Sequence, residues 1–333
     1  MSYRLRLCAT ALIGLLTATS FGAPAVSATK VKISWPGPAT TYWLPYLVAQ
    51  KKGWLASIET EDVIVTGDAN AMRVLLSGNA DVVIVGLLNT LASIHQGAKI
   101  RAIGSWQPIG DYNLVLQTGK GNKLADLAGK TFASSGPGGM PDQIPRLVMR
   151  KHGIDESTAR FVQVGGHAAR LQAVLGGRAE ATLVNTVTAL RGVQEGKVTV
   201  VGRLSQEFPD LGYIWSVIRT ESLNKPEMVA ALQVLTEAGI RGSRFIMDNP
   251  DEAADILHER VPDLDRAFLR AVVRDLNSEN LWGVDGGLNP KIAEDTIDIN
   301  VKLGNLPTPA KVADVLDPRF VEAAMKTLGP YKK

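Results

Sequence analysis

The sequence is poor in the residues on which covalent and metal chemistry depend. Its single cysteine, Cys8, lies within the first 28 residues, and only 4 histidines occur among 333 residues. A chain with one cysteine forms no internal disulfide and no zinc site built from cysteines. The histidines lack the spacing of zinc ligands, and no Gly-x-Ser-x-Gly motif is present to carry a nucleophilic serine. We therefore predict no metal, no cofactor and no catalytic residue.

Long hydrophobic runs and an excess of one charge are also missing. Beyond residue 28 the sequence has no apolar run approaching the ~20 residues that a transmembrane helix needs. There are 36 Lys and Arg residues against 33 Asp and Glu residues, and the formal net charge of +3 is not gathered in a basic stripe. Nucleic acid is therefore not an expected partner.

The first 28 residues have the pattern of a secretory signal peptide. Arg4 and Arg6 precede an apolar segment at residues 7–16, and small residues follow it. We predict cleavage after Ala28, with Ala25 as the alternative site. The mature protein is then expected to be periplasmic.

The most informative feature that is present is an internal repeat with an offset of 99 residues. Residues 63–69 (VIVTGDA) align with 162–168 (VQVGGHA), and residues 75–81 (LLSGNAD) align with 174–180 (VLGGRAE). This period is far longer than the roughly 20–50 residues of solenoid and propeller repeats. The sequence therefore predicts two similar lobes with a ligand-binding cleft between them.

Both halves of the repeat alternate short β-type runs with helical segments. This pattern predicts an α/β fold of two three-layer lobes with parallel-rich sheets. The expected strands are residues 31–35, 62–66, 81–85, 100–104, 130–133, 160–164, 181–184 and 198–202. The expected helices are residues 43–52, 69–77, 89–96, 141–151, 168–175 and 188–195. Two further runs, 112–118 and 213–220, are expected to pair with each other as the hinge between the lobes.

After residue 226 the pattern becomes that of amphipathic helices without a strand. The expected helices are residues 227–246, 251–259, 264–275 and 290–303. We expect this helical tail to pack on the first lobe. The predicted organisation is a signal peptide at 1–28, a discontinuous first lobe of 29–115 and 217–333, and a second lobe of 116–216. The protein is expected to be a monomer.

Open parallel sheets bind ligands beyond the carboxyl ends of their strands. The loops expected there are rich in glycine, hydroxyl, amide and aromatic residues, and residues 134–140 (SSGPGGM) are the clearest case. Glycines let the backbone approach a ligand, and a helix N-terminus attracts an anion. The same loop taken alone is equally consistent with a flexible turn that caps the next helix. The predicted ligand-binding residues are Thr40, Thr41, Tyr42, Trp43, Gly67, Asp68, Gly86, Asn89, Trp106, Ser135, Gly136, Gly138, Gly139, His167, Asn185, Thr186 and Tyr213.

Few charged residues fall near these loops. Asp81 and Glu180 match across the repeat, but each is expected at the opposite end of its strand, as a cap or a surface charge. Arg170 could reach inward from a helix, although a solvated face is the expected position. Asp68 and His167 also match across the repeat. They are the candidates for polar contacts with a ligand or, on an enzyme, for acid–base chemistry.

Seven short motifs run through the chain in a fixed order. They are residues 46–49 (YLVA), 52–53 (KG), 75–81 (LLSGNAD), 97–103 (GAKIRAI), 124–130 (LADLAGK), 177–180 (GRAE) and 248–253 (DNPDEA). Together they resemble the periplasmic substrate-binding proteins of ABC importers in the nitrate, sulfonate and taurine group. That group shares its fold with the thiamine-pyrimidine synthases, whose cysteine-rich segment is absent here.

The resemblance implies a type II periplasmic binding protein, whose two lobes close on a solute about a two-strand hinge and then dock on a membrane permease. The segments that correspond to the ligand loops of that group are residues 40–43, 67–68, 86–89, 135–139 and 185–186. The expected function is a receptor, not an enzyme, for a small organic anion such as a sulfonate, taurine, nitrate or a carboxylate. The alternatives are an enzyme on the same fold that acts on a small carboxylate or a pyrimidine, and a binding protein coupled to a sensor.

Overall fold

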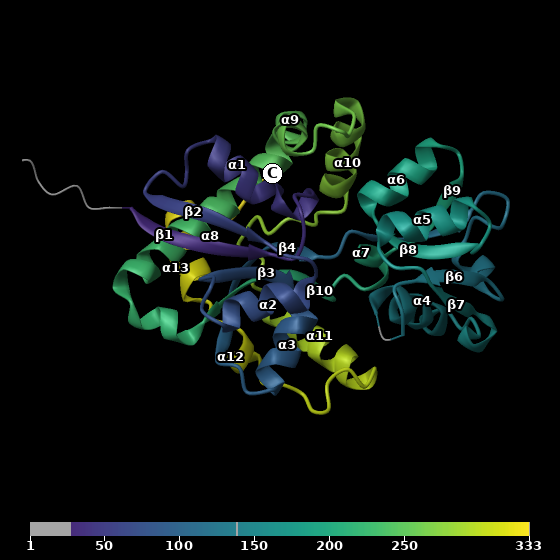
Figure 1. The fold of residues 1–333 in the computed structure, drawn as a ribbon, viewed down its shortest axis with the longest axis horizontal. Coiled ribbons are helices and arrows are strands. Elements are labelled where there is room, and N and C mark those ends of the chain that lie inside the picture. Colours follow the sequence, from purple (N-terminus) through teal and green to yellow (C-terminus); the bar gives the residue numbers. More distant parts are fainter. Residues whose placement is uncertain (1–27, 138, 333) are drawn as a thin grey trace, which may run out of the picture.

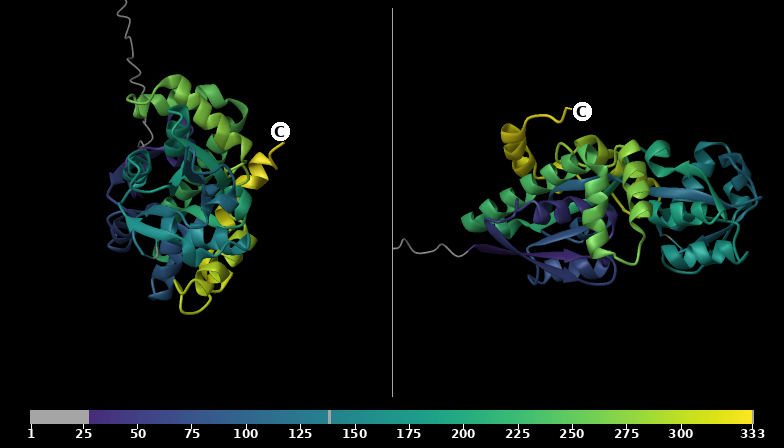
Figure 2. Two further views of the ribbon diagram at one scale, coloured as in Figure 1. Left: turned by 90° about the vertical axis from the view of Figure 1, so that its right-hand side faces the viewer. Right: turned by 90° about the horizontal axis from the view of Figure 1, so that it is seen from above.

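A computed structural model describes residues 28–137 and 139–332, which form two β-sheets with helices on both faces of each (Figure 1). The predicted signal peptide, apart from Ala28, lies outside the described residues, and so does Gly138. The two sheets lie end to end along the long axis of the molecule (Figure 2). Each sheet with the helices packed on it is called a lobe below. No helix within the described ranges is long and apolar enough to cross a membrane.

The first sheet has the strand order β2-β1-β3-β10-β4. Its strands are β1 (Thr29–Trp35), β2 (Ile58–Ile64), β3 (Val82–Gly86), β4 (Ile100–Ile109) and β10 (Gly212–Arg219). Strand β1 runs parallel to β2 and β3, whereas β10 lies antiparallel between β3 and β4. The second half of the chain repeats this plan.

The second sheet has the strand order β7-β6-β8-β5-β9. Its strands are β5 (Tyr112–Gln117), β6 (Thr131–Ser134), β7 (Arg160–Gln163), β8 (Ala181–Asn185) and β9 (Val198–Arg203). Strand β6 runs parallel to β7 and β8, and β5 lies antiparallel between β8 and β9. The predicted α/β architecture of two sheets that are rich in parallel strands is confirmed.

The two runs expected to pair as a hinge do not pair with each other. Strand β5 is an inner strand of the second sheet, and β10 is an inner strand of the first. Both are buried over most of their length, so each needs a sheet neighbour on either side. The chain crosses between the lobes at Gly110 and Asp111. It returns through α7 (Leu204–Glu207) and the turn that follows.

Helices cover both faces of each sheet (Figure 1). On the first sheet one face carries α1 (Leu44–Lys51), α8 (Pro226–Asp248) and α9 (Pro250–Arg260), and the other carries α2 (Asp68–Leu76), α3 (Leu87–His95) and α11 (Pro290–Lys302). On the second sheet α4 (Met140–Lys151) covers one face, and α5 (His167–Leu175) and α6 (Thr186–Gln194) cover the other. The alternation of side chains along each strand explains these layers. In β3, Val82 and Ile84 face α1 and α8, whereas Val83 and Val85 face α2 and α3.

The internal repeat reappears as matched hydrogen bonds at the starts of the strands. The Lys32 amide donates to Asp81 Oδ2 (2.9 Å), and the Thr131 amide donates to Glu180 Oε2 (3.3 Å). Each donor lies 99 residues from its counterpart, and so does each acceptor. These carboxylates therefore join the first and third strands of each half, far from the loops at the other end, as predicted for caps.

Two tryptophans predicted to lie at the cleft belong instead to the core. Trp43 stacks on Trp35 with ring centroids 3.8 Å apart, and both side chains are fully buried. Trp106 was expected in a loop, but it lies within β4, which continues to Ile109, and its ring is parallel to that of Tyr46 at 6.1 Å. Packing against Trp35 and Tyr46 buries the apolar surface of both rings, which is more favourable than exposing it to water in a loop.

The tail is helical, as predicted, and α8 packs against α1 and the first sheet. Three more helices follow α9 in addition to α11: α10 (Arg266–Ser278), α12 (Val312–Val315) and α13 (Arg319–Leu328). The sequence analysis missed α12 and α13, and α13 packs on α8 at the side of the first lobe (Figure 2). The expectation that the tail packs on the first lobe is incomplete, because α10 also contacts α6 of the second lobe.

The closest approach of α1 and α8 allows a test of this packing. A Cβ at Gly242 would overlap with the backbone carbonyl of Pro45, so Gly242→Ala must push the two helices apart. We expect the free energy of unfolding to fall by about 2–3 kcal/mol, measured by urea denaturation. Gly166→Ala is the matched control, because its φ is −71° and no atom lies within 4 Å of the added Cβ. Equal stability of the two variants would contradict the packing described here.

Candidate ligand-binding site

A cavity of about 600 Å³ lies between the lobes and is lined by residues from both. Its walls are the loops that follow β1, β2 and β3 in the first lobe and β6, β7 and β8 in the second. The helices α2, α3, α4, α5 and α6 begin at these loops, so their N-terminal backbone amides lie around the cavity. This is the position at which open parallel sheets bind ligands. The size suits a small molecule.

Most of the predicted ligand-binding residues line this cavity. They are Thr40, Thr41, Tyr42, Asp68, Gly86, Asn89, Ser135, Gly139, His167, Asn185 and Tyr213. Gly67, Gly136 and Thr186 lie beside it without lining it, Trp43 and Trp106 are in the core, and Gly138 is outside the described residues. Gly67 has a φ of 83°, which favours glycine where the chain turns into α2.

Asp68 and His167, which match across the repeat, occupy equivalent places at the first residues of α2 and α5. Asp68 Oδ2 accepts hydrogen bonds from the Gly86 amide and from Asn89 Nδ2, both at 3.1 Å. His167 Nδ1 accepts a hydrogen bond from the Asn185 amide at 3.0 Å. Gly86 and Asn185 are themselves 99 residues apart. The same hydrogen bond thus joins the N-termini of consecutive helices in both lobes, α2 to α3 and α5 to α6. Its acceptor is a carboxylate in the first lobe and an imidazole in the second.

The hydrogen bonds of His167 define which of its ring nitrogens carries the proton. Besides Asn185, Arg170 Nη2 lies 3.1 Å from Nδ1 and has only protons to offer, so Nδ1 is the acceptor. Burial, with the nearby Arg170 charge as a second cause, lowers the pKa of His167 to about 4. The ring is therefore neutral at physiological pH. Its Nε2–H has no partner among the described residues and is available to a ligand.

Arg170 is buried, contrary to the expectation of a solvated helix face. Its side chain is 3% exposed and donates to the carbonyl oxygens of Leu183 (3.1 Å) and Gly165 (2.6 Å). A signal for this position was present in the repeat, because residue 170 matches Ala71, which belongs to the core of the first lobe. Arg170 thus places a buried positive charge behind His167.

Asp111 is a cavity residue that the sequence analysis missed. It lies at the crossing from β4 to β5 and is 4% exposed, and its Oδ2 accepts a long hydrogen bond (3.4 Å) from the Thr186 amide. Burial raises the pKa of its carboxyl to about 6. In the sequence, Asp111 lies between the mainly apolar residues 100–109 and 112–117. The Gly110-Asp111 pair between them is the one local signal of the crossing. The tail residues Thr296 and Asn300 also line the cavity and were missed.

Three tyrosines surround the polar groups. Tyr112 stacks on His167 with centroids 5.6 Å apart, and Tyr213 meets Tyr112 edge-on at 5.6 Å. Tyr42 lies against Trp35 at 6.3 Å, and burial raises its pKa to about 12. These three rings, called the aromatic wall below, line the cavity from both lobes: Tyr42 and Tyr213 from the first and Tyr112 from the second.

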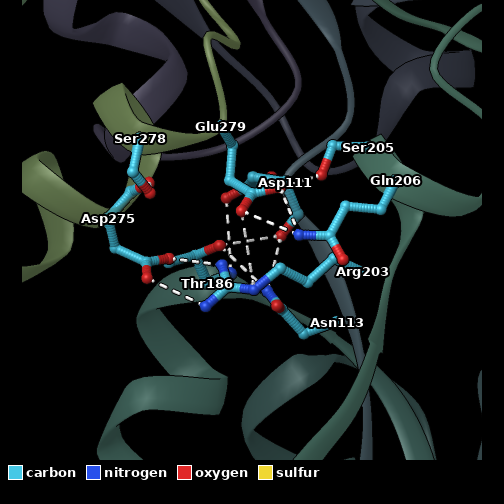
Figure 3. A network of polar contacts seen from close by, with 9 residues as sticks. All are labelled: Asp111, Asn113, Thr186, Arg203, Ser205, Gln206, Asp275, Ser278 and Glu279. Carbon is cyan, nitrogen blue, oxygen red and sulfur yellow. Dashed lines mark hydrogen bonds and ion pairs between the residues drawn. The ribbon is translucent and has the colours of Figure 1, made fainter.

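Polar contacts between the lobes flank the cavity. Arg203 on β9 binds both carboxylate oxygens of Asp275 (2.7 and 2.9 Å), and Glu279 at the end of α10 accepts from Ser205 and Gln206 (Figure 3). A second contact joins α4 to the loop after α11. There the carboxamides of Gln143 and Asn305 exchange two hydrogen bonds of 2.8 and 2.9 Å. The tail therefore connects the second lobe to the first on two sides.

The protonation of His167 can be tested directly. Its pKa of about 4 lies below the value of about 6.5 expected for an unfolded imidazole, so the unfolded chain binds more protons between these two values. His167 should therefore lower stability as pH falls through that window. An NMR titration of the histidine rings should show one ring that stays neutral to about pH 4, and His167→Gln should remove that signal. A midpoint near 6.5 for this ring would contradict the burial described here.

Comparison with known proteins was made at the level of sequence and of fold. The model of the NMT1/THI5 like family matches residues 40–253 of the 333 residues, which is more than half of the chain. YtlA of Bacillus subtilis (strain 168), which is described as a candidate binding protein, is 25% identical over 287 residues and matches 84% of this chain and 85% of its own length.

Two solved structures have a similar fold. The ligand-binding component of an ABC-type import system from Staphylococcus aureus, with zinc bound, superposes with a TM-score of 0.71 at 17% identity and covers 89% of this chain and 99% of its own. The described residues of the present chain contain no group of three or more His, Cys, Asp or Glu placed to hold a metal ion. The periplasmic aliphatic sulphonate binding protein SsuA from Escherichia coli superposes with a TM-score of 0.70 at 14% identity and covers 88% and 93%. The chain therefore belongs to the NMT1/THI5 like family and has the fold of the periplasmic binding proteins of ABC importers.

Proposed function

We propose that this protein is a periplasmic receptor that delivers a small organic anion to an ABC importer. The observation that carries the proposal is the cavity of about 600 Å³, whose walls come from two lobes that the described part of the chain joins by two crossings. A solute that contacts both walls stabilises the arrangement in which they face each other, so binding and closure are coupled. The family and the fold support the same function.

The second lobe supplies the groups suited to an acid. The N-termini of α4, α5 and α6 begin at the cavity, and helix N-termini favour negative charge. The neutral His167 adds an Nε2–H donor, and the buried Arg170 raises the local positive potential. An acid group bound there would be held by backbone amides, the Ser135 hydroxyl and His167. A sulfonate, a carboxylate or nitrate could use the same donors.

We propose that the protein does not transform its ligand. Asp68 and His167 are the candidates for acid–base chemistry, and each already accepts a hydrogen bond from a helix N-terminus. The free lone pair of the neutral His167 ring is on Nδ1, which already accepts from Asn185 and Arg170. The ring would have to break these contacts before it could take up a proton as a base. Release of the solute chemically unchanged is the expected result. We further propose that residues 1–28 are a signal peptide and that the protein is exported to the periplasm. There it acts as a monomer and delivers its solute to a membrane permease.

Binding and closure can be measured together. Purified protein is screened by thermal shift against sulfonates, carboxylates, nitrate and pyrimidines, and a ligand at about 100-fold its Kd should stabilise the protein by about 2.7 kcal/mol. Small-angle scattering should then show a smaller radius of gyration, and mass spectrometry should recover the solute unaltered. His167→Ala should weaken binding of the acid about tenfold through loss of the Nε2–H donor. Turnover of the solute, or stabilisation with no change in shape, would contradict the receptor.

The contact between Gln143 and Asn305 offers a test of closure at a residue outside the cavity lining. Asn305 does not line the cavity, whereas Gln143 does. Asn305→Ala removes two hydrogen bonds between the lobes and one to Asn300 within the first lobe. Loss of the contact between the lobes should cost about 1 kcal/mol and weaken ligand affinity about fivefold, mainly through faster dissociation. Asn79→Ala is the matched control, because Asn79 is exposed and its side chain donates to Ser77, a neighbour in the same loop. Equal dissociation rates in the two variants would show that this contact does not hold the closed state.

A further inference from the structure

The wall of the cavity formed by the first lobe carries negative charge without a counterion. Asp68 lines it with Oδ2 bonded to Gly86 and Asn89, while its Oδ1 accepts no hydrogen bond from the described residues. Asp111 lies at the crossing between the lobes, where the Thr186 amide and the neutral Gln107 side chain are among its hydrogen-bonding neighbours. Among the described residues no Lys or Arg forms an ion pair with either carboxyl, and the Asp275 carboxylate near Asp111 adds charge of the same sign. The half-buried Asp68 and the buried Asp111 therefore lack a cationic partner among the described residues.

The only Lys or Arg among the described lining residues belongs to the other wall. Arg170 is committed to Leu183, Gly165 and His167, all in the second lobe, and it forms no ion pair with Asp68 or Asp111. The equivalent first-lobe position is Ala71. The two halves of the repeat therefore differ at this position. In the first lobe Asp68 is a carboxylate without a cation beside it, whereas in the second lobe His167 is a neutral donor next to the Arg170 cation. The cavity is electrically polarised from one lobe to the other.

We propose that the ligand is a zwitterion whose protonated amine faces Asp68 and Asp111 while its acid group faces His167. This inference rests on the proposed receptor function and specifies the class of solute. A buried carboxylate is stabilised by a charged N–H donor more than by any neutral group. An amine at this place supplies the missing cation to the first-lobe wall without disturbing the acid site in the second lobe.

The aromatic wall fits the same ligand. Tyr42 and Tyr213 line the cavity close enough to Asp68 for its charge to raise the pKa of both phenols, after the larger effect of burial. An ammonium group beside these rings would gain cation–π attraction as well as the ion pair. The raised pKa of Asp111, about 6, is the expected property of a carboxyl whose cationic partner comes with the ligand.

Matched pairs of probes test this inference. Homotaurine is compared with propanesulfonate, and γ-aminobutyrate with butyrate, by isothermal titration calorimetry of the purified protein, with propylamine as the cation alone. In at least one pair the aminated compound should bind about tenfold more tightly than its deaminated partner. Asp68→Asn should abolish this preference and change the affinity for the deaminated acid less than about threefold. Asparagine can still accept from Gly86, so the local fold is retained; Asp111→Asn provides an independent variant.

Asp263→Asn, which removes an exposed carboxylate remote from the cavity lining, should leave the preference unchanged. The inference is wrong if no aminated probe binds, if the deaminated acids bind as tightly as their partners, or if the preference survives in both Asp68→Asn and Asp111→Asn. Propanesulfonate or butyrate that binds and closes the lobes without any preference for the amine overturns the inference and leaves the receptor function standing. Failure of every solute in the broader screen, by contrast, would overturn the receptor function itself.

Discussion

The cavity depends on one type of interaction that occurs once in each lobe. The side chain at the first residue of the helix after the second strand accepts a hydrogen bond from the backbone amide at the start of the next helix. Asp68 makes this contact with Gly86, and His167 makes it with Asn185. The contact holds two helix N-termini side by side at the carboxyl edge of the sheet. Without it, two unsatisfied amides and their dipoles would face the cavity with no defined geometry.

The same contact gives the two walls different electrical character. A carboxylate at residue 68 neutralises the positive field of the helix N-termini that it joins, and it leaves an excess of negative charge on its second oxygen. An imidazole at residue 167 satisfies the equivalent amide without adding charge, so the N-terminal field of its lobe remains. Arg170 strengthens that field from behind. A duplicated architecture can therefore recognise an asymmetric molecule, because one substitution at a repeated position changes which ligand group each wall attracts.

The connection between the lobes determines how such a cavity can respond to a ligand. Within residues 28–137 and 139–332 two crossings join the sheets, and the antiparallel strands β5 and β10 that follow them are inner strands of opposite lobes. The helical tail adds an ion pair at α10 (Figure 3) and a pair of carboxamides after α11. Polar contacts of this kind separate at lower cost than a hydrophobic interface, because water replaces their hydrogen bonds. The tail can thus support one relative position of the lobes without preventing another.

The sequence alone determined the duplicated α/β plan, most strand and helix positions, and the loops that form the cavity, because these follow from local periodicity and from an offset of 99 residues. It also identified Asp68 and His167 as a matched pair. Only the tertiary structure decided that β5 and β10 are inner strands of different sheets. It also placed Trp43 and Trp106 in the core and Asp111 and Arg170 at the cavity. The reason is physical. Local pattern specifies which residues are apolar and where a helix begins, whereas burial of a charge depends on contacts between segments that are distant in the chain.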